Sequence, residues 1–167
     1  MPQLWIEHEL QTLVSLVRLL DQQLSALSDK STDVEDADAF GYFDTMEHLV
    51  GLAMVIFQTY VATVCGTILV EKHLALKKGP FHSGGMYKAE IVNHAANYWK
   101  HNNEWGTERS DRRRRTIEDA FESVGFPVGT DYPLSGVLTE LSAPKFASLE
   151  PLIEILHEWK SAVLTSS

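Results

Sequence analysis

The feature that most constrains the fold is a run of 22 residues, positions 49–70, that contains no charged side chain. A helix of this length can cross a lipid bilayer, but a helix that is apolar on all sides can also form the centre of a helical bundle. The run carries several polar side chains, and neither flank is strongly enriched in lysine or arginine. We therefore expect a buried central helix, with a single membrane span as the alternative.

The composition is that of one globular domain: 167 residues, of which 44% are hydrophobic and 22% charged. A net charge of −9 argues against a protein whose whole surface coats nucleic acid, although it allows a local basic patch. The single cysteine, Cys65, excludes an intramolecular disulfide and predicts a buried thiol in a reducing compartment. Residues 1–7 do not resemble a signal peptide, so we expect a cytoplasmic location.

Apolar residues recur at helical spacing along most of the chain and predict five helices. These helices cover residues 3–27, 45–76, 86–102, 110–123 and 148–164. Asp44 and Glu47 resemble a capping box at the start of the second helix, and Ser110 is a candidate cap for the fourth. We expect an acidic mobile linker at residues 28–38, a flexible turn at 81–85, and a helical turn or short strand at 137–141. The fold predicted for residues 1–167 is a single all-α bundle of about five helices.

One line of polar side chains follows the third helix. Glu90, His94, Asn97 and His101 are spaced so that they share a face of that helix. A histidine beside a carboxylate or an amide can transfer protons near neutral pH. A solvated polar face is the simpler interpretation of the same pattern.

Residues 96–101, with the sequence Ala-Asn-Tyr-Trp-Lys-His, lie near the end of this helix. They resemble a degenerate form of the Arg-Asn-x-x-x-His signature of HEPN domains. The resemblance implies a helical, often dimeric protein of a bacterial toxin, defence or RNA-processing system. In active members the arginine and the histidine cleave RNA without a metal, in a site shared by two subunits. By this resemblance His101 and Asn97 are candidate catalytic residues, and the neighbouring Lys100 is the third candidate.

Ala96 stands where that signature has its arginine. An arginine would supply a fixed cation for the phosphate and for the charge that develops on it. Alanine supplies none, and Lys100 does not occupy the same position on the helix. The resemblance therefore implies a HEPN-like, RNA-associated protein that is catalytically degenerate. If the protein is an enzyme, we expect a metal-independent ribonuclease.

A cluster of five arginines, Arg109 and residues 112–115, lies within seven positions. Such a cluster can hold phosphate groups, although consecutive residues point in different directions around a helix. The alternative is a solvated surface in which arginines pair with acids one turn further along. Trp105 can stack on a base or anchor helix packing. The candidate ligand-binding residues are Glu90, His94, Trp105, Arg109, Arg112 and Arg113.

The sequence suggests no metal site and no cofactor. The histidines have no metal-ligand spacing, and there is no glycine-rich phosphate loop or nucleophile elbow. We expect a homodimer, because one short chain cannot easily cover all the apolar surface of residues 49–70. RNA and a partner protein are the other expected partners. A non-enzymatic dimeric scaffold is the alternative function.

Overall fold

The computed structural model describes residues 2–105, 112–143 and 147–166, and most of these are helical. The predicted all-α bundle is confirmed. The described elements are α1 Pro2–Thr32, α2 Tyr42–Ile68, α3 Lys72–Ala75, β1 Phe81–His82, β2 Met86–Tyr87, α4 Lys88–His101, the 3-10 helix η1 Asn102–Glu104, α5 Arg112–Ser123, α6 Pro133–Ser142 and α7 Glu150–Thr165.

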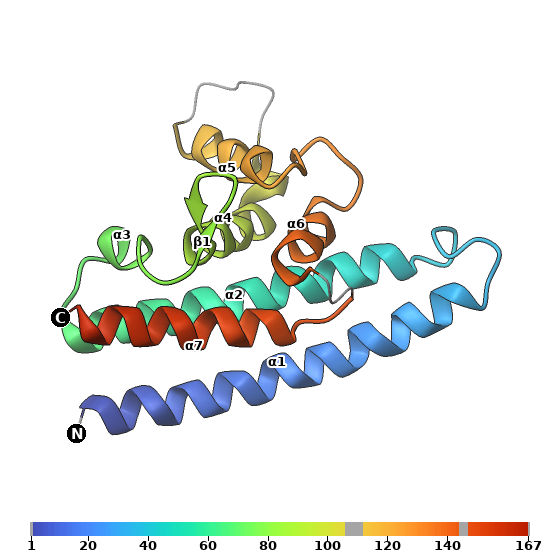
Figure 1. Ribbon diagram of the computed structural model, residues 1–167. Helices are drawn as coiled ribbons and strands as arrows, with labels where there is room; N and C mark the ends of the chain where they lie inside the picture. The colour runs from blue at the N-terminus through green and yellow to red at the C-terminus, as the bar shows by residue number, and fades with distance from the viewer. Residues whose placement is uncertain (1, 106–111, 144–146, 167) are drawn as a thin grey trace.

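The helices form two layers (Figure 1). The long helices α1, α2 and α7 run side by side, and α4, α5 and α6 form the second layer, in which α4 and α6 pack on α2. The core between them contains the fully buried side chains of Trp159, Tyr60 and Phe121. The Tyr60 hydroxyl donates to the Ile6 carbonyl at 3.3 Å, and the Trp159 indole donates to the Ala75 carbonyl at 2.8 Å. These hydrogen bonds satisfy polar atoms that burial would otherwise make costly.

Helix α2 contains most of the uncharged segment 49–70, and it is shorter than the sequence predicts. It ends at Ile68, because Leu69 adopts a left-handed conformation with φ 57°. The expected continuation to residue 76 is wrong, since the chain turns there and forms the separate short helix α3. No glycine marks position 69, so local sequence gives no signal for this break.

Within the described residues, α2 is the one helix with the length and mean hydropathy of a membrane span. In its most apolar window, 56% of the residues are buried inside the protein. A core helix of a bundle meets the same two criteria.

Several predicted boundaries require correction. Helix α1 continues to Thr32, so residues 28–32 are helical and not part of a linker. Residues 81–87 form a hairpin in which Phe81 pairs with Tyr87, where the sequence predicts a flexible turn. For residues 137–141 the helical alternative is confirmed, because they belong to helix α6. Ser110, the predicted cap of α5, lies outside the described residues.

The predicted capping box at the start of α2 is wrong. The N-cap is Gly41, with φ 67°, and Asp44 lies inside the first helical turn. Glu47 instead accepts hydrogen bonds from the backbone N–H groups of Leu134 and Ser135, at 2.7 and 2.8 Å, and from the Ser135 hydroxyl at 2.6 Å. It therefore caps the N-terminus of α6, where a carboxylate also complements the helix dipole.

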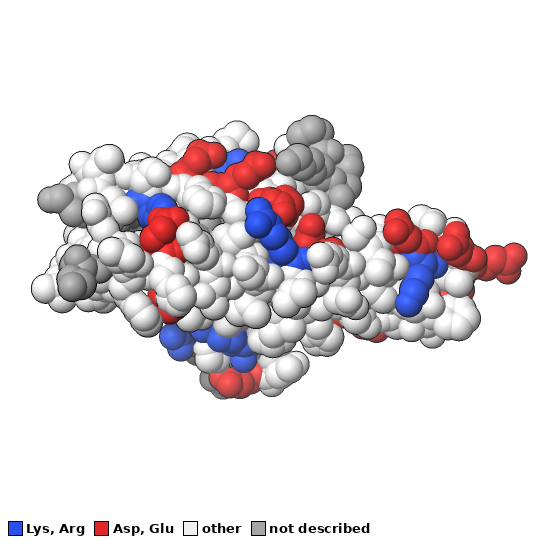
Figure 2. Space-filling model, turned by 90° about the horizontal axis from the view of Figure 1, so that it is seen from below, with Lys and Arg blue, Asp and Glu red and all other residues white. Residues whose placement is uncertain are grey.

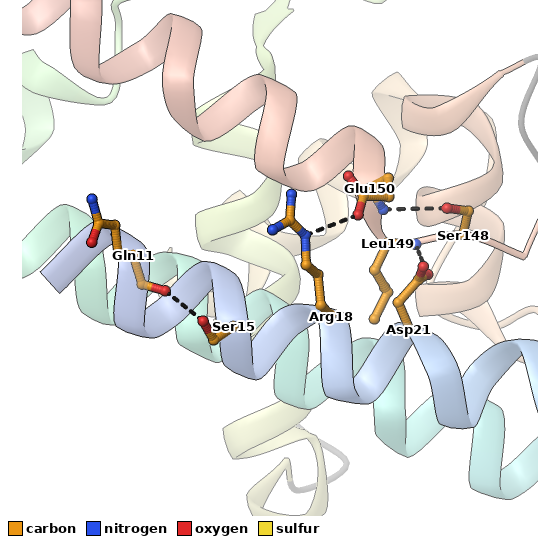
Figure 3. A network of polar contacts seen from close by, with 7 residues as sticks. All are labelled: Gln11, Ser15, Arg18, Asp21, Ser148, Leu149 and Glu150. Carbon is orange, nitrogen blue, oxygen red and sulfur yellow. Dashed lines mark hydrogen bonds and ion pairs between the residues drawn. The ribbon is translucent and has the colours of Figure 1, made fainter. Parts of the chain in front are cut away.

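The N-terminus of α7 is held in a similar way by α1 (Figure 3). Asp21 accepts a hydrogen bond from the Leu149 N–H at 2.5 Å, and Arg18 pairs with Glu150 at 3.3 Å. Carboxylates of the first two helices thus fix the starting points of two helices that follow much later in the chain.

Replacing Glu47 by alanine should lower the free energy of unfolding by about 2–3 kcal/mol, because the loss leaves donors at the start of α6 without a charged acceptor. Asp44→Ala should cost less than about 1 kcal/mol, since only a favourable helix-dipole interaction is lost. Urea unfolding of both variants measures the difference. Equal losses, or a larger loss in Asp44→Ala, would support the capping box instead.

Candidate functional site

The candidate site lies on helix α4, which packs closely against α2. Ala95 and Ala96 are fully buried at this interface. Gly51 of α2 leaves room for the Trp99 indole, because a side chain at position 51 would overlap the ring. The Trp99 Nε1 donates to His48 Nδ1 at 3.2 Å. Trp99 therefore anchors the contact between the two helices.

A buried amide cluster joins α2 to α4 and contains two of the predicted catalytic residues. Gln58 Nε2 donates to Oδ1 of both Asn93 and Asn97 at 2.9 Å, and the Lys100 ammonium donates to Gln58 Oε1 at 2.5 Å. Gln58 and Asn93 are each 7% exposed. Asn97 and Lys100 are thus engaged in a contact between helices.

Gln58 and Asn93 were not among the candidate residues from sequence. The available signal was Gln58 itself, which is an amide inside an uncharged run. A buried amide needs a polar partner, so its presence predicts a polar contact on a neighbouring helix. The sequence could not indicate which helix supplies that contact.

His94 is largely enclosed, and its Nδ1 atom is buried with no hydrogen-bond partner among the described residues. Burial lowers the pKa of His94 from its ordinary value of 6.5, Asp119 raises it, and Lys72 lowers it further. The imidazole is therefore neutral at pH 7, and protonation is unfavourable in the folded state.

His101 is more accessible and ends helix α4. Its Nδ1 lies 3.1 Å from Glu104 Oε2, and its side chain is 32% exposed. Glu90 lies in the first turn of α4, eleven residues away and therefore about 16 Å along the helix axis. The predicted line of four polar groups is thus distributed along the helix and does not converge on one point.

The arginine cluster begins helix α5, which packs on α4 through Phe121 and Tyr98. The Arg114 guanidinium lies 5.0 Å from the centre of the Trp105 ring and pairs with Glu118 at 2.9 Å. The rings of Trp105 and Tyr98 also meet edge to face, with their centres 5.4 Å apart. Trp105 is therefore in contact with Arg114 on one side and Tyr98 on another.

Arg112 and Arg113 are exposed at the start of α5, and Arg109 lies outside the described residues. The Cys65 thiol is buried, and burial raises its pKa, so it is a poor nucleophile. Among the described residues, no group of three His, Cys, Asp or Glu side chains could hold a metal ion. Comparisons with protein-family models, curated proteins and solved structures find no match to this chain.

Gln58→Leu should destabilise the protein by about 1–3 kcal/mol for each buried polar group left without a partner. Lys100→Met should cost less than Gln58→Leu, because it removes a single donor from a more exposed side chain. Urea unfolding of the two variants tests this order. Equal stability of Gln58→Leu and the wild type would show that the amide cluster contributes nothing to folding.

Acidification should destabilise the protein through His94. Its pKa is lowered in the folded state, so the unfolded state binds a proton more readily, and the contribution to unfolding free energy falls as pH drops below about 6.5. His94→Gln should reduce the difference in unfolding free energy between pH 7.5 and 5.5. His157→Gln, which replaces an exposed histidine, is the control. An unchanged difference in His94→Gln would contradict the assignment.

Proposed function

We propose that this protein binds RNA through a basic surface at the junction of α4 and α5, as a HEPN-like member of a bacterial defence or toxin system. The observation that carries the proposal is the grouping of cations and an aromatic ring at this junction. Arg112 and Arg113 begin α5, and Arg114 lies against Trp105. His101 ends the adjoining helix α4, whereas the Lys100 ammonium of that helix is engaged by Gln58 of α2.

The charge distribution supports a localised contact with phosphate groups. The chain carries a net charge of −9, so an RNA strand is repelled by most of the surface and attracted to a basic group such as this one. The neighbouring ring of Trp105 is intermediate in exposure and can contribute a stacking surface for a base.

We infer binding without efficient cleavage. Ala96 is fully buried between α2 and α4, so the position that corresponds to the signature arginine contributes no cation to the surface. Asn97 and Lys100 are held by Gln58. His101 has Glu104 as its hydrogen-bond partner, and position 96 adds no cation to stabilise the charge that develops on a phosphodiester during cleavage.

A dimeric scaffold that binds a partner protein is the second candidate function. It is favoured by the exposed and uncharged face of α2, on which Leu52 and Thr59 lie. For either function we propose a cytoplasmic protein, in keeping with a single buried and unpaired cysteine.

RNA binding should weaken when Arg112 and Arg113 are both replaced by alanine. Each lost phosphate contact should reduce the slope of log K against log salt by about 0.7 for a single strand. Fluorescence anisotropy with a labelled 20-nucleotide single-stranded RNA measures both effects. The double variant Lys30→Ala/Lys88→Ala removes the same charge elsewhere and should bind as the wild type does. Equal weakening in both variants would contradict a localised site.

A metal-free cleavage assay tests the inference that catalysis is lost. We expect no cleavage in the presence of EDTA that depends on His101. Cleavage that disappears in His101→Ala would show that the site is active, with its cation supplied from elsewhere.

A further inference from the structure

The outer face of α2 is exposed and uncharged. α1, α4, α6 and α7 all contact α2 on its other sides. The exposed and partly exposed residues on the remaining face are Leu52, Val55, Ile56, Thr59, Ala62, Thr63 and Gly66. From residue 49 to its end, α2 carries no charged side chain. No charge on this part of the face therefore opposes contact with another apolar surface.

The neighbouring helix α1 extends this apolar face. Leu16 and Leu19 are 42% and 58% exposed. Arg18 and Asp21 mark the side of α1 that contacts α7, and the two leucines lie on the opposite side of the helix by the period of 3.6 residues. The space-filling view from below shows a broad uncharged area along the long axis of the molecule (Figure 2).

The side chains on the outer face of α2 are arranged by size around Thr59. Large residues, Leu52, Val55 and Ile56, precede it, and small ones, Ala62, Thr63 and Gly66, follow it. A two-fold axis at Thr59 would place Leu52 opposite Gly66, Val55 opposite Thr63 and Ile56 opposite Ala62 of a second copy. Such a large-to-small match allows two helices to approach closely and to interdigitate.

We propose that a second copy of this chain docks antiparallel along the outer face of α2, with the two-fold axis at Thr59. A surface that complements itself about an axis is what a symmetric dimer requires. This proposal does not rest on RNA binding, because the basic surface at α4 and α5 involves other residues.

The charges beyond the two ends of α2 also favour the antiparallel arrangement. Before and at the start of α2 the chain carries five acids: Asp33, Glu35, Asp36, Asp38 and Asp44. After α2 it carries three lysines and one acid: Lys72, Lys77, Lys78 and Glu71. An antiparallel dimer brings the acidic end of each copy toward the basic end of the other, whereas a parallel one would bring like charges together.

Gly66 provides a direct test. A side chain added there meets open space within the monomer, so Gly66→Leu should fold normally yet clash with Leu52 of a second copy. We expect a dimer by analytical ultracentrifugation for the wild type, and a dimer weakened about tenfold or more for Gly66→Leu. The double variant Gly66→Leu/Leu52→Ala should recover part of the affinity, because the large and small positions are exchanged. Gln11→Leu, on another side of α1, is the control and should remain dimeric.

Cross-linking tests the position of the axis. In a Cys65→Ser background, Thr59→Cys should form a covalent dimer under mild oxidation, because the axis brings residue 59 next to its own copy. Gln11→Cys should not. A monomeric wild type at about 100 μM, well above the micromolar dissociation constant of a specific complex, would overturn the proposal. So would a dimer that Gly66→Leu leaves intact, or recovery of the wild type in the membrane fraction.

Discussion

The need to cover an uncharged helix organises this protein. Helix α2 has no charged side chain from residue 49 to its end, so most of its surface is unfavourable in water. α1 and α7 lie beside it in one layer, and α4 and α6 pack on it from the other. Its buried amide, Gln58, needs polar partners, and Asn93, Asn97 and Lys100 supply them. Apolar burial provides the affinity between the helices, and the amide cluster fixes how α4 is placed.

Charged side chains of the first layer fix the start of two later helices. Glu47 caps α6, and Asp21 and Arg18 hold the first residues of α7. A helix N-terminus has unpaired N–H groups, so an acceptor from another helix serves as well as a local cap. These contacts join residues more than eighty positions apart, and they make the arrangement of helices specific.

The amide cluster also limits the chemistry at the end of α4. The polar groups that sequence spacing places on one helix face are divided in the structure: Asn97 and Lys100 face Gln58, while His101 faces Glu104. Ala96, which stands where the similar signature has its arginine, is fully buried. The exposed basic groups lie instead at the start of α5, beside Trp105. For this reason we propose recognition of a phosphate backbone and not its cleavage.

The sequence by itself determined the all-α class, the central place of residues 49–70, and the existence of the long helices, because apolar periodicity depends on which side chains must leave water. It also marked residues 96–101 and the arginine cluster, but not their partners. Only the tertiary structure decided that Glu47 caps α6, that α2 ends at Ile68, and that Gln58 holds α4. These features depend on groups brought together from distant positions, and local spacing carries no information about such distances.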